Sequence, residues 1–381
     1  MAAIDAVVIG GGLAGAAFAL ELARHGRDVV VLERTATPHL KVCGDFLGGN
    51  AQELLAYLGL DLKSMGATAI NTLRLRIANR TTEAPLPFRA AGVSRLRLDQ
   101  ALLEEAQRVG ARVIRGSTVT GLVADGSTVL VRTGTTAYQA RTAALATGKY
   151  NLRGWQRDLG SLSAFKMPFS LSSTAQRALD GVVALAIYDG GYIGACLVED
   201  QTATLCWLAD RRLIGQFGGD WSAQLAHLAH RTEMFGDLLG GATPRVKKPA
   251  AVSAIPFGYL RRAIVADNVF PIGDQLAVIP SFTGDGTTLA LSSAIAAAWA
   301  VMENRPAAQF QSSFIGALGA QFRWGAVIGA GLKTKIACRL GSFVIARCPW
   351  VTTTLVQLTR FEPKFWPSRR NLASPPRATH A

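Results

Sequence analysis

Near the start of the chain, three glycines are spaced in a way that dictates the local fold. Gly10, Gly12 and Gly15 form G-x-G-x-x-G directly after the apolar run 6–9, and a helical segment leads from them to a second apolar run at 28–32. In such a βαβ unit the first glycine permits a tight turn, the second lets a pyrophosphate approach the backbone, and the third lets the helix pack against the strand. The helix N-terminus then faces the phosphates with free N–H groups. The pattern predicts a site for an adenine dinucleotide.

An acidic residue stands where such a site needs one. Glu33 ends the second apolar run about 20 residues after Gly12. At the end of that strand a carboxylate can accept hydrogen bonds from both ribose hydroxyls. We therefore predict that Glu33, with Arg34 next to it, contacts the cofactor.

A second glycine-containing segment lies far downstream. Residues 268–286 read NVFPIGDQLAVIPSFTGDG, and the uncharged stretch 287–302 follows them. That stretch falls short of the roughly 18 to 20 residues of a membrane span, so it predicts a buried helix. A short strand at 269–272 would deliver Gly273 and Asp274 to a turn ahead of this helix.

This downstream segment resembles the flavin-contacting element of the FAD enzymes typified by p-hydroxybenzoate hydroxylase and the geranylgeranyl reductases. The resemblance implies that Asp274 holds the ribityl chain and that Pro280 lies along the isoalloxazine ring. It also implies that the loop of Gly284, Asp285 and Gly286 contacts the flavin pyrimidine. The cofactor implied is non-covalent FAD rather than NAD. The implied fold is α/β: an FAD-binding Rossmann-like domain of the glutathione reductase type, a β-sheet substrate domain and C-terminal helices.

Two intermediate segments fit the same family. Residues 94–110 match its arginine followed four residues later by aspartate, which implies that Arg95 lies near the FAD; Asp99 is a natural N-cap for the helix that follows. Residues 143–148, AALATG, resemble the strand and turn that close over the adenosine. Lys149 then stands where the hydroxylases continue with Asp-Gly. NAD(P)H therefore stays an open candidate for the electron donor, and the sequence encodes no separate nicotinamide domain.

The geranylgeranyl reductase branch supplies one further resemblance. Residues 41–45, KVCGD, match a Lys-x-Cys-Gly element that this branch places near the flavin. Cys43 could act there as a weak acid beside the reacting carbon, or it could be a small residue in a tight loop. The segment 191–207 reads as two strands around an Asp-Gln turn, without the Trp and Pro that the branch carries there, which leaves a substrate other than a polyprenyl chain open.

These features predict an FAD-dependent oxidoreductase that reduces or dehydrogenates a C=C or C–C bond of a hydrophobic organic substrate. One alternative is a flavin monooxygenase that hydroxylates an aromatic or polyketide-like substrate. Another is an electron-transfer flavoprotein that serves a protein partner. A flavin halogenase is disfavoured because the Trp-x-Trp-x-Ile-Pro signature is absent. Neither a metal site nor a nucleophile motif of the G-x-S-x-G type is predicted.

Composition limits the class of protein. The 381 residues, 49% of them apolar, allow two domains and a large core. Five cysteines without C-x-x-C spacing favour a reducing compartment over a disulfide framework. The apolar start of the chain reads as the first strand rather than a signal peptide. We therefore expect a cytoplasmic protein.

The alternation of patterns along the chain predicts a discontinuous domain. Strands and helices alternate in 1–70, 94–160 and 256–310, which we assign to FAD binding within 1–310. The insertions 71–93 and 161–255 read mainly as strands, with one helix near 221–234, and are expected to cover the flavin as a sheet. A basic helical region at 311–363 and a flexible tail at 364–381 complete the prediction.

Charge is concentrated near the C-terminus. The chain carries a formal net charge of +14, and residues 321–381 hold ten Lys or Arg and one acid, Glu362, which leaves +9 in that segment. Aromatic and aliphatic residues are interleaved with these charges, as in surfaces that adhere to anionic lipid. The segment predicts either a peripheral contact with the inner membrane face or a helical cap over the substrate site. Nucleic acid is not an expected partner because no recognition module is present.

Overall fold

The dinucleotide-type turn lies at the centre of a largely parallel sheet. The computed structural model describes residues 4–77, 79–263, 266–331, 343, 349–358 and 360–361. The first sheet has the order β6-β2-β1-β9-β8-β7, and β17 also pairs with β9. Its parallel strands are β1 (Ile4–Ile9), β2 (Val29–Glu33), β6 (Arg112–Arg115), β9 (Ala137–Leu145) and β17 (Val269–Pro271). The hairpin of β7 (Val119–Asp125) and β8 (Thr128–Thr133) continues the sheet.

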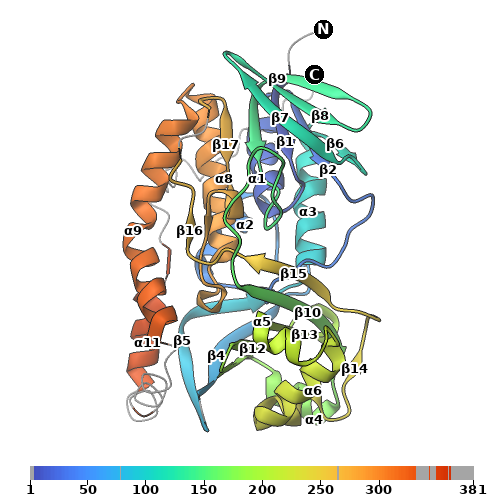
Figure 1. The fold of residues 1–381 in the computed structure, drawn as a ribbon, viewed down its shortest axis with the longest axis vertical. Helices are drawn as coiled ribbons and strands as arrows, with labels where there is room; N and C mark the ends of the chain where they lie inside the picture. Colours follow the sequence, from blue (N-terminus) through green and yellow to red (C-terminus); the bar gives the residue numbers. More distant parts are fainter. Residues whose placement is uncertain are drawn as a thin grey trace.

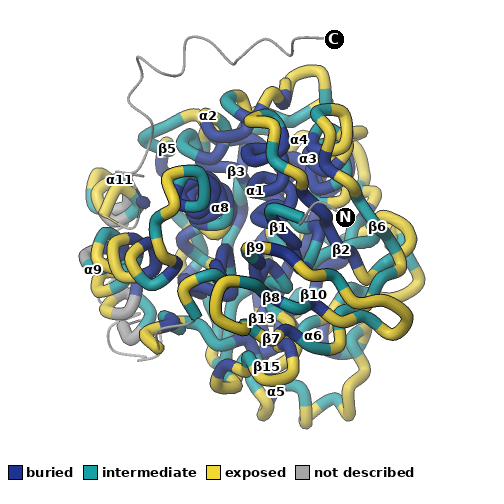
Figure 2. Tube along the Cα trace, turned by 90° about the horizontal axis from the view of Figure 1, so that it is seen from above, coloured by how far each residue is buried: buried dark blue, intermediate teal, exposed yellow. Residues whose placement is uncertain are grey.

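Four helices lie beside this sheet. They are α1 (Leu13–Ala23), α2 (Gly49–Tyr57), α3 (Arg95–Arg108) and α8 (Gly286–Met302). Every residue of α1 is buried, because α1 lies between α3 and α8 and against the sheet. Figure 2 shows α1 and α8 as buried tubes near the middle of the molecule. The absence of charge from α8 is thus explained by packing on all sides, as the stretch 287–302 predicted.

A second, mostly antiparallel sheet lies below the first (Figure 1). Its order is β14-β10-β13-β12-β11-β4-β5-β3, with β15 also on β10. The strands are β3 (Phe46–Leu47), β4 (Thr68–Ile77), β5 (Arg80–Gly92), β10 (Leu162–Ser170), β11 (Val182–Tyr188), β12 (Gly191–Leu197), β13 (Ala203–Asp210), β14 (Thr243–Pro244) and β15 (Ala250–Ile255). β3 and the start of β4 lie within 1–70, so that segment contributes to both sheets.

Four short helices pack on the outer face of the second sheet. They are α4 (Ser173–Leu179), α5 (Arg211–Gln216), α6 (Trp221–Arg231) and α7 (Glu233–Leu239). The sequence predicted a single helix near 221–234. The helix instead breaks at Thr232, whose φ of −123° and ψ of 81° are not helical. The other helices were missed because they have seven residues or fewer and show little periodicity.

The C-terminal helices flank the molecule. α9 (Ala307–Gly331) packs on α8, and α11 (Pro349–Leu358) packs on β5, as Figure 1 shows at the side of the fold. The chain then returns inward, so that Phe361 is buried with its ring 5.6 Å from that of Phe314. Much of the basic segment, with the tail predicted at 364–381, lies outside the described residues. Within the described ranges no helix combines the length and hydrophobicity that crossing a bilayer requires.

Short elements complete the region between the sheets. β16 (Tyr259–Leu260) pairs with β18 (Ala277–Val278). Three 3-10 turns, η1 (Glu199–Gln201), η2 (Gly273–Gln275) and η3 (Ser281–Thr283), lie in loops. The last two follow β17 and lead to α8, and Val278 between them packs with Cys206 and Leu208 of the second sheet, so this connection lies between the two sheets.

Candidate functional site

The predicted dinucleotide turn depends on glycine at two of its three positions. Gly10 has a φ of +108°, and a Cβ placed there would lie 2.5 Å from the carbonyl oxygen of Ala146. A Cβ at Gly15 would lie 1.9 Å from the carbonyl oxygen of Gly10. Gly12 is different, because the nearest atom to its hypothetical Cβ is Lys41 Nζ at 3.5 Å. Gly12 is therefore kept open for a ligand, whereas Gly10 and Gly15 serve packing.

Glu33 is tied to the turn from the end of β2. Its carboxylate accepts hydrogen bonds from Gly11 N at 2.8 Å and from the backbone and hydroxyl of Thr35 at 3.0 and 2.7 Å. Burial alone would raise the pKa of Glu33, but these hydrogen bonds and the charge of Lys41 hold it below its usual value. Arg34 lies beside it with its guanidinium 3.9 Å from the ring centre of Tyr150.

Two cations converge on the open side of the turn. Lys41 Nζ lies 2.8 Å from Asp99 Oδ2, and Arg95 donates to both oxygens of Asp99 at 2.6 and 3.0 Å. Burial would raise the pKa of Asp99, but its two cationic partners lower it. The cap of α3 is Ser94, whose hydroxyl accepts from Arg97 N; the prediction that Asp99 caps the helix was wrong. Asp99 instead positions Arg95 and Lys41 beside Gly12, where a diphosphate would need positive charge.

Lys41 was not among the predicted cofactor contacts. The sequence showed it in KVCGD, but nothing local indicated that its ammonium group reaches back to Gly12 and Asp99. The structure brings it there because the loop 34–45 runs from β2 past the N-terminus of α1.

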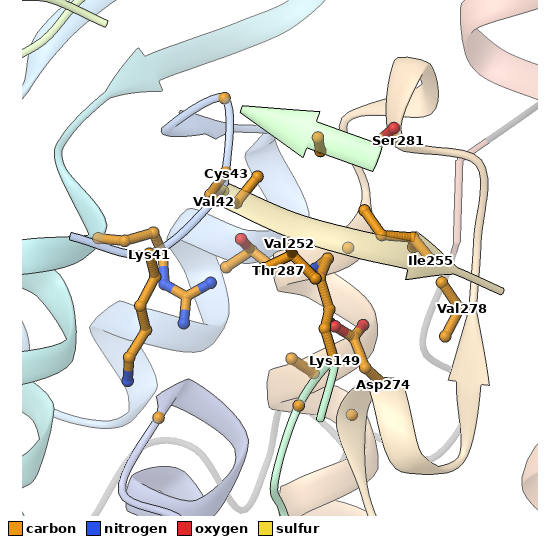
Figure 3. A pocket seen from close by; sticks show the side chains of 18 of the residues that line it. Lys41, Val42, Cys43, Lys149, Val252, Ile255, Asp274, Val278, Ser281 and Thr287 are labelled. Carbon is orange, nitrogen blue, oxygen red and sulfur yellow. The ribbon is translucent and has the colours of Figure 1, made fainter. Parts of the chain in front are cut away.

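The downstream turn places an ion pair at the base of the site. Lys149 Nζ, from the loop after β9, lies 2.9 Å from Asp274 Oδ2 in η2. Figure 3 shows the two side chains beside each other, with Val252 and Ile255 of β15 nearby. Gln275 fastens the two loops by donating to Thr147 Oγ1 and to the carbonyls of Gly148 and Tyr150. Burial would raise the pKa of Asp274, but Lys149 lowers it.

One cavity of about 590 Å³ joins these features. Ten of the predicted residues line it: Gly10, Gly12, Glu33, Arg34, Cys43, Arg95, Gly273, Asp274, Gly284 and Gly286. Gly15, Pro280 and Asp285 do not belong to the lining. The two sequence motifs, which are far apart along the chain, therefore border a single space that is large enough for a small-molecule ligand.

Asp285 faces the C-terminal helices instead. Its buried carboxylate accepts from Gln321 Nε2 at 3.1 Å, from Arg360 Nη1 at 3.3 Å and from the backbone N–H of Phe361. It also accepts from Thr288 Oγ1 at 2.6 Å. Asp285 thus joins the glycine loop before α8 to α9 and to the segment after α11.

Cys43 lies on the cavity wall in a loop that a buried charge pair anchors. Asp45, with a φ of +55°, accepts from Arg95 N at 3.0 Å and from Thr204 Oγ1 at 2.8 Å, and it pairs with the buried Lys166 of β10. Burial would lower the pKa of Lys166, but pairing with Asp45 raises it. This network sets the position of the Cys43 loop.

A second thiol and a phenol share this wall with Cys43. Cys206 of β13 and Tyr192 of β12 both line the cavity. Burial raises the pKa of Cys206 to about 12 and also raises the pKa of Tyr192, so both groups are protonated at neutral pH. Neither was predicted, because strand residues without a motif give no local signal.

Comparison with known proteins identifies the first part of the chain. Residues 3–143 match the family model described as FAD binding domain. The menaquinone reductase of Mycobacterium tuberculosis is 35% identical over 130 residues, which cover 32% of this chain and 31% of the relative. A probable electron transfer flavoprotein-quinone oxidoreductase of Escherichia coli is 31% identical over 174 residues, or 42% of this chain and 39% of the relative. These alignments span about a third of the relatives' length.

The fold extends over nearly the whole chain. The flavin-dependent brominase Bmp2 superposes with a TM-score of 0.78 at 16% identity, covering 97% of both chains. At that identity the likeness concerns the fold alone. The predicted fold class and cofactor are therefore confirmed: residues 3–143 match an FAD-binding domain, and the chain has the p-hydroxybenzoate hydroxylase-like fold.

Proposed function

We propose that this protein is an FAD-dependent oxidoreductase that reduces or dehydrogenates a C=C or C–C bond of a hydrophobic organic substrate. The observation that carries the proposal is the single cavity, in which the predicted FAD contacts continue into a wall of aliphatic strand residues. The similarity of this chain to a menaquinone reductase and to an electron transfer flavoprotein-quinone oxidoreductase supports a hydrophobic substrate. The resemblance of residues 41–45, KVCGD, to the Lys-x-Cys-Gly element of the geranylgeranyl reductases supports a reaction at a carbon–carbon bond.

The residues present fit FAD and divide its binding between them. Gly12, Lys41 and Arg95 would hold the diphosphate, because an open backbone turn and two cations meet there. Asp274 would hold the ribityl hydroxyls, and Glu33 the ribose. When bound, FAD supplies hydride transfer. The protein would orient the substrate and exclude water with its apolar wall, and the Cys43 thiol, which lines the cavity, would hold or release a proton.

An assay of flavin redox change tests this proposal. Protein purified with FAD would be reduced by dithionite without oxygen and mixed with candidate alkenes and prenylated quinones. Reoxidation of the flavin together with loss of the double bond is expected. Substrate-dependent oxygen uptake with a hydroxylated product would instead favour the monooxygenase alternative. Reoxidation only by a protein acceptor would favour the electron-transfer alternative. NAD(P)H is tested as the donor in the same assay.

We also propose a peripheral membrane contact through the C-terminal helices. Trp324 and Val327 of α9 and Trp350 of α11 are large apolar residues that are 45%, 61% and 67% exposed. Arg323, which precedes Trp324 in the sequence, is exposed as well. Apolar side chains interspersed with basic ones suit the interface of an anionic bilayer. The helical-cap alternative is supported by the docking of Phe361 and Gln321 into the core.

A further inference from the structure

The cavity has an apolar floor built from two paired strands. β4 and β11 run parallel, and three pairs face the cavity: Leu73 with Val183, Leu75 with Leu185, and Ile77 with Ile187. We call these three pairs the aliphatic ladder. Alternate residues of a strand share one face, so the pairs form a continuous strip. At about 3.3 Å per residue, the ladder extends roughly 13 Å.

The charges of β4 point to its other face. Arg74 pairs with Glu83 at 2.6 Å, and Arg76 pairs with Glu233 at 3.4 Å. The alternation of leucine, arginine and isoleucine along β4 therefore keeps charge off the ladder. A hydrocarbon chain lying on the ladder would contact aliphatic side chains along its whole length.

One cation lies at the inner end of this strip. Arg360, from the segment after α11, lines the cavity, and its guanidinium is 4.2 Å from the ring centre of Phe88. Phe88 and Phe46 belong to the same apolar cluster as Val183, the first pair of the ladder. A Cβ at Gly284 would lie 3.9 Å from Arg360 Nη2, so the cation also borders the predicted flavin loop.

Arg360 keeps hydrogen-bonding capacity for a ligand. A guanidinium has five N–H donors. Nη1 donates to Asp285 at 3.3 Å, whereas Nη2, which borders the Gly284 loop, makes no hydrogen bond to a described residue. Burial lowers the pKa of Arg360, and Asp285 offsets this only in part. A guanidinium that lies in an apolar wall and lacks some of its hydrogen bonds attracts an acidic oxygen. Without such a ligand its charge is poorly solvated.

We propose that the cavity binds an amphiphile whose acidic oxygen contacts Arg360 and whose linear hydrocarbon tail lies along the aliphatic ladder. The head group would then lie beside the predicted flavin loop and the tail would extend toward the tip of the β4–β5 hairpin. This inference rests on the proposed function for the position of the flavin, but it concerns binding and can be tested without turnover.

Titrations of the FAD-loaded protein test the head group. The probes are dodecanoate, dodecanol and 4-dodecylphenol, followed by flavin absorbance and calorimetry. We expect either dodecanoate or 4-dodecylphenol to bind at least tenfold more tightly than dodecanol. The reason is that dodecanol cannot offer Arg360 an acidic oxygen for a charge-assisted hydrogen bond. The phenol distinguishes a phenolic from a carboxylate head. Arg360→Met should remove the preference and Arg360→Lys should retain part of it, whereas Arg323→Met, on the exposed face of α9, should not change it.

Chain length tests the ladder. From octanoate to dodecanoate, affinity should rise about fourfold for each added methylene that is buried. Ile187→Trp should fill the far end, weakening hexadecanoate at least tenfold and leaving octanoate unchanged. Val123→Trp, on the exposed β7, is the control.

Equal binding of acids and alcohols, or an affinity independent of chain length, overturns the inference. If acids bind more tightly than alcohols and affinity rises with chain length, but no double bond is reduced or formed, the proposed function is refuted and the inference stands. Turnover of a hydrophobic substrate, with no effect of Arg360→Met on binding, would refute the inference alone.

Discussion

Lys149 Nζ and Asp274 Oδ2 lie 2.9 Å apart, although the two residues are separated by 125 positions in the chain. The pair closes the base of the cavity at the place where Asp274 is predicted to meet the ribityl chain. A lysine therefore balances this carboxylate in the protein without cofactor. When FAD binds, its ribityl hydroxyls would either displace Lys149 from Asp274 or bind Asp274 beside it. Lys149 is therefore expected to affect both the stability of the protein and its affinity for FAD.

Lys149→Gln should destabilise the FAD-free protein in a pH-dependent way. The folded pKa of Asp274 is lowered, so its contribution is present above about pH 4 and is lost as pH falls through the folded value. The folded pKa of Lys149 is raised, so its contribution is present below about pH 10 and is lost at higher pH. Because both side chains are partly exposed, we expect about 1–2 kcal/mol at pH 7.

Thermal unfolding of wild type and Lys149→Gln across pH measures this effect. The difference in Tm should be constant from pH 5 to 9 and should close below about pH 4. Arg112→Gln, which breaks the exposed pair with Asp28, is the matched control and should change Tm little. A gap of the same size at pH 3 as at pH 7 would show that the lysine acts through packing.

Substitutions of Gly12 and Gly15 should separate cofactor binding from folding. A Cβ at Gly12 would make only ordinary contacts, with Lys41 Nζ at 3.5 Å, Arg95 Nη2 at 3.8 Å and Asp99 Oδ2 at 3.9 Å, so Gly12→Val should fold with nearly unchanged stability and lose FAD. Gly15→Val should lose both FAD binding and stability, because its Cβ would collide with the carbonyl of Gly10. The bound FAD per protein after gel filtration and the urea midpoint are the two readouts. A yellow Gly12→Val protein would place the diphosphate elsewhere.

Removal of the Asp285 carboxylate should release the C-terminal segment. Asp285→Ala leaves Arg360 buried without its counter-ion and leaves Phe361 N–H without its acceptor, a loss of about 3 kcal/mol or more. Faster proteolysis after α9 and a lower urea midpoint are expected. Glu303→Ala, which breaks an exposed pair with Arg305, should stay within about 0.5 kcal/mol of wild type. Unchanged proteolysis in Asp285→Ala would show that other contacts hold the segment.

The membrane contact calls for substitution rather than deletion of residues 321–381, because Phe361 and Gln321 are buried. Replacing Trp324, Val327 and Trp350 by serine should abolish flotation with anionic vesicles and leave thermal stability nearly unchanged. Binding of wild type should weaken with salt as screening increases. The matched control replaces Val123 and Leu159, exposed residues elsewhere on the surface. Equal flotation with neutral and anionic vesicles would argue against the electrostatic part of the proposal.

The sequence predicted the elements whose signals are local. The glycine turn, Glu33 and the uncharged α8 were readable because steric and hydrophobic constraints act within a few residues. The Asp-Gly dipeptide at 125–126, a typical hairpin signal, likewise lies at the turn between β7 and β8. The cap of α3 was wrongly assigned to Asp99, because an aspartate near the start of an amphipathic helix suggests a cap, whereas the helix begins one turn earlier, after Ser94.

Contacts between distant segments gave no such signal. Lys166 appears in the sequence as an ordinary strand lysine, and its burial with Asp45 follows only from the packing of the KVCGD loop on β10. Arg360 belongs to a segment that the sequence showed as a basic surface, yet the chain returns there to the cavity. Lys166 lies 121 residues from Asp45, and Arg360 lies 75 residues from Asp285. Local periodicity carries no information about such pairs.

The last prediction concerns Cys43, which lines the cavity in the loop that Asp45 anchors. If its thiol takes part in proton transfer, Cys43→Ser should keep FAD and slow substrate turnover at least tenfold, because a hydroxyl is a much weaker acid. Cys43→Ala should slow turnover at least as much. Flavin reduction by the donor without substrate should change little in either variant. Cys206→Ser, a neighbouring wall residue, is the control and should retain turnover. Full activity of both Cys43 variants would mean that the residue is selected for its small size.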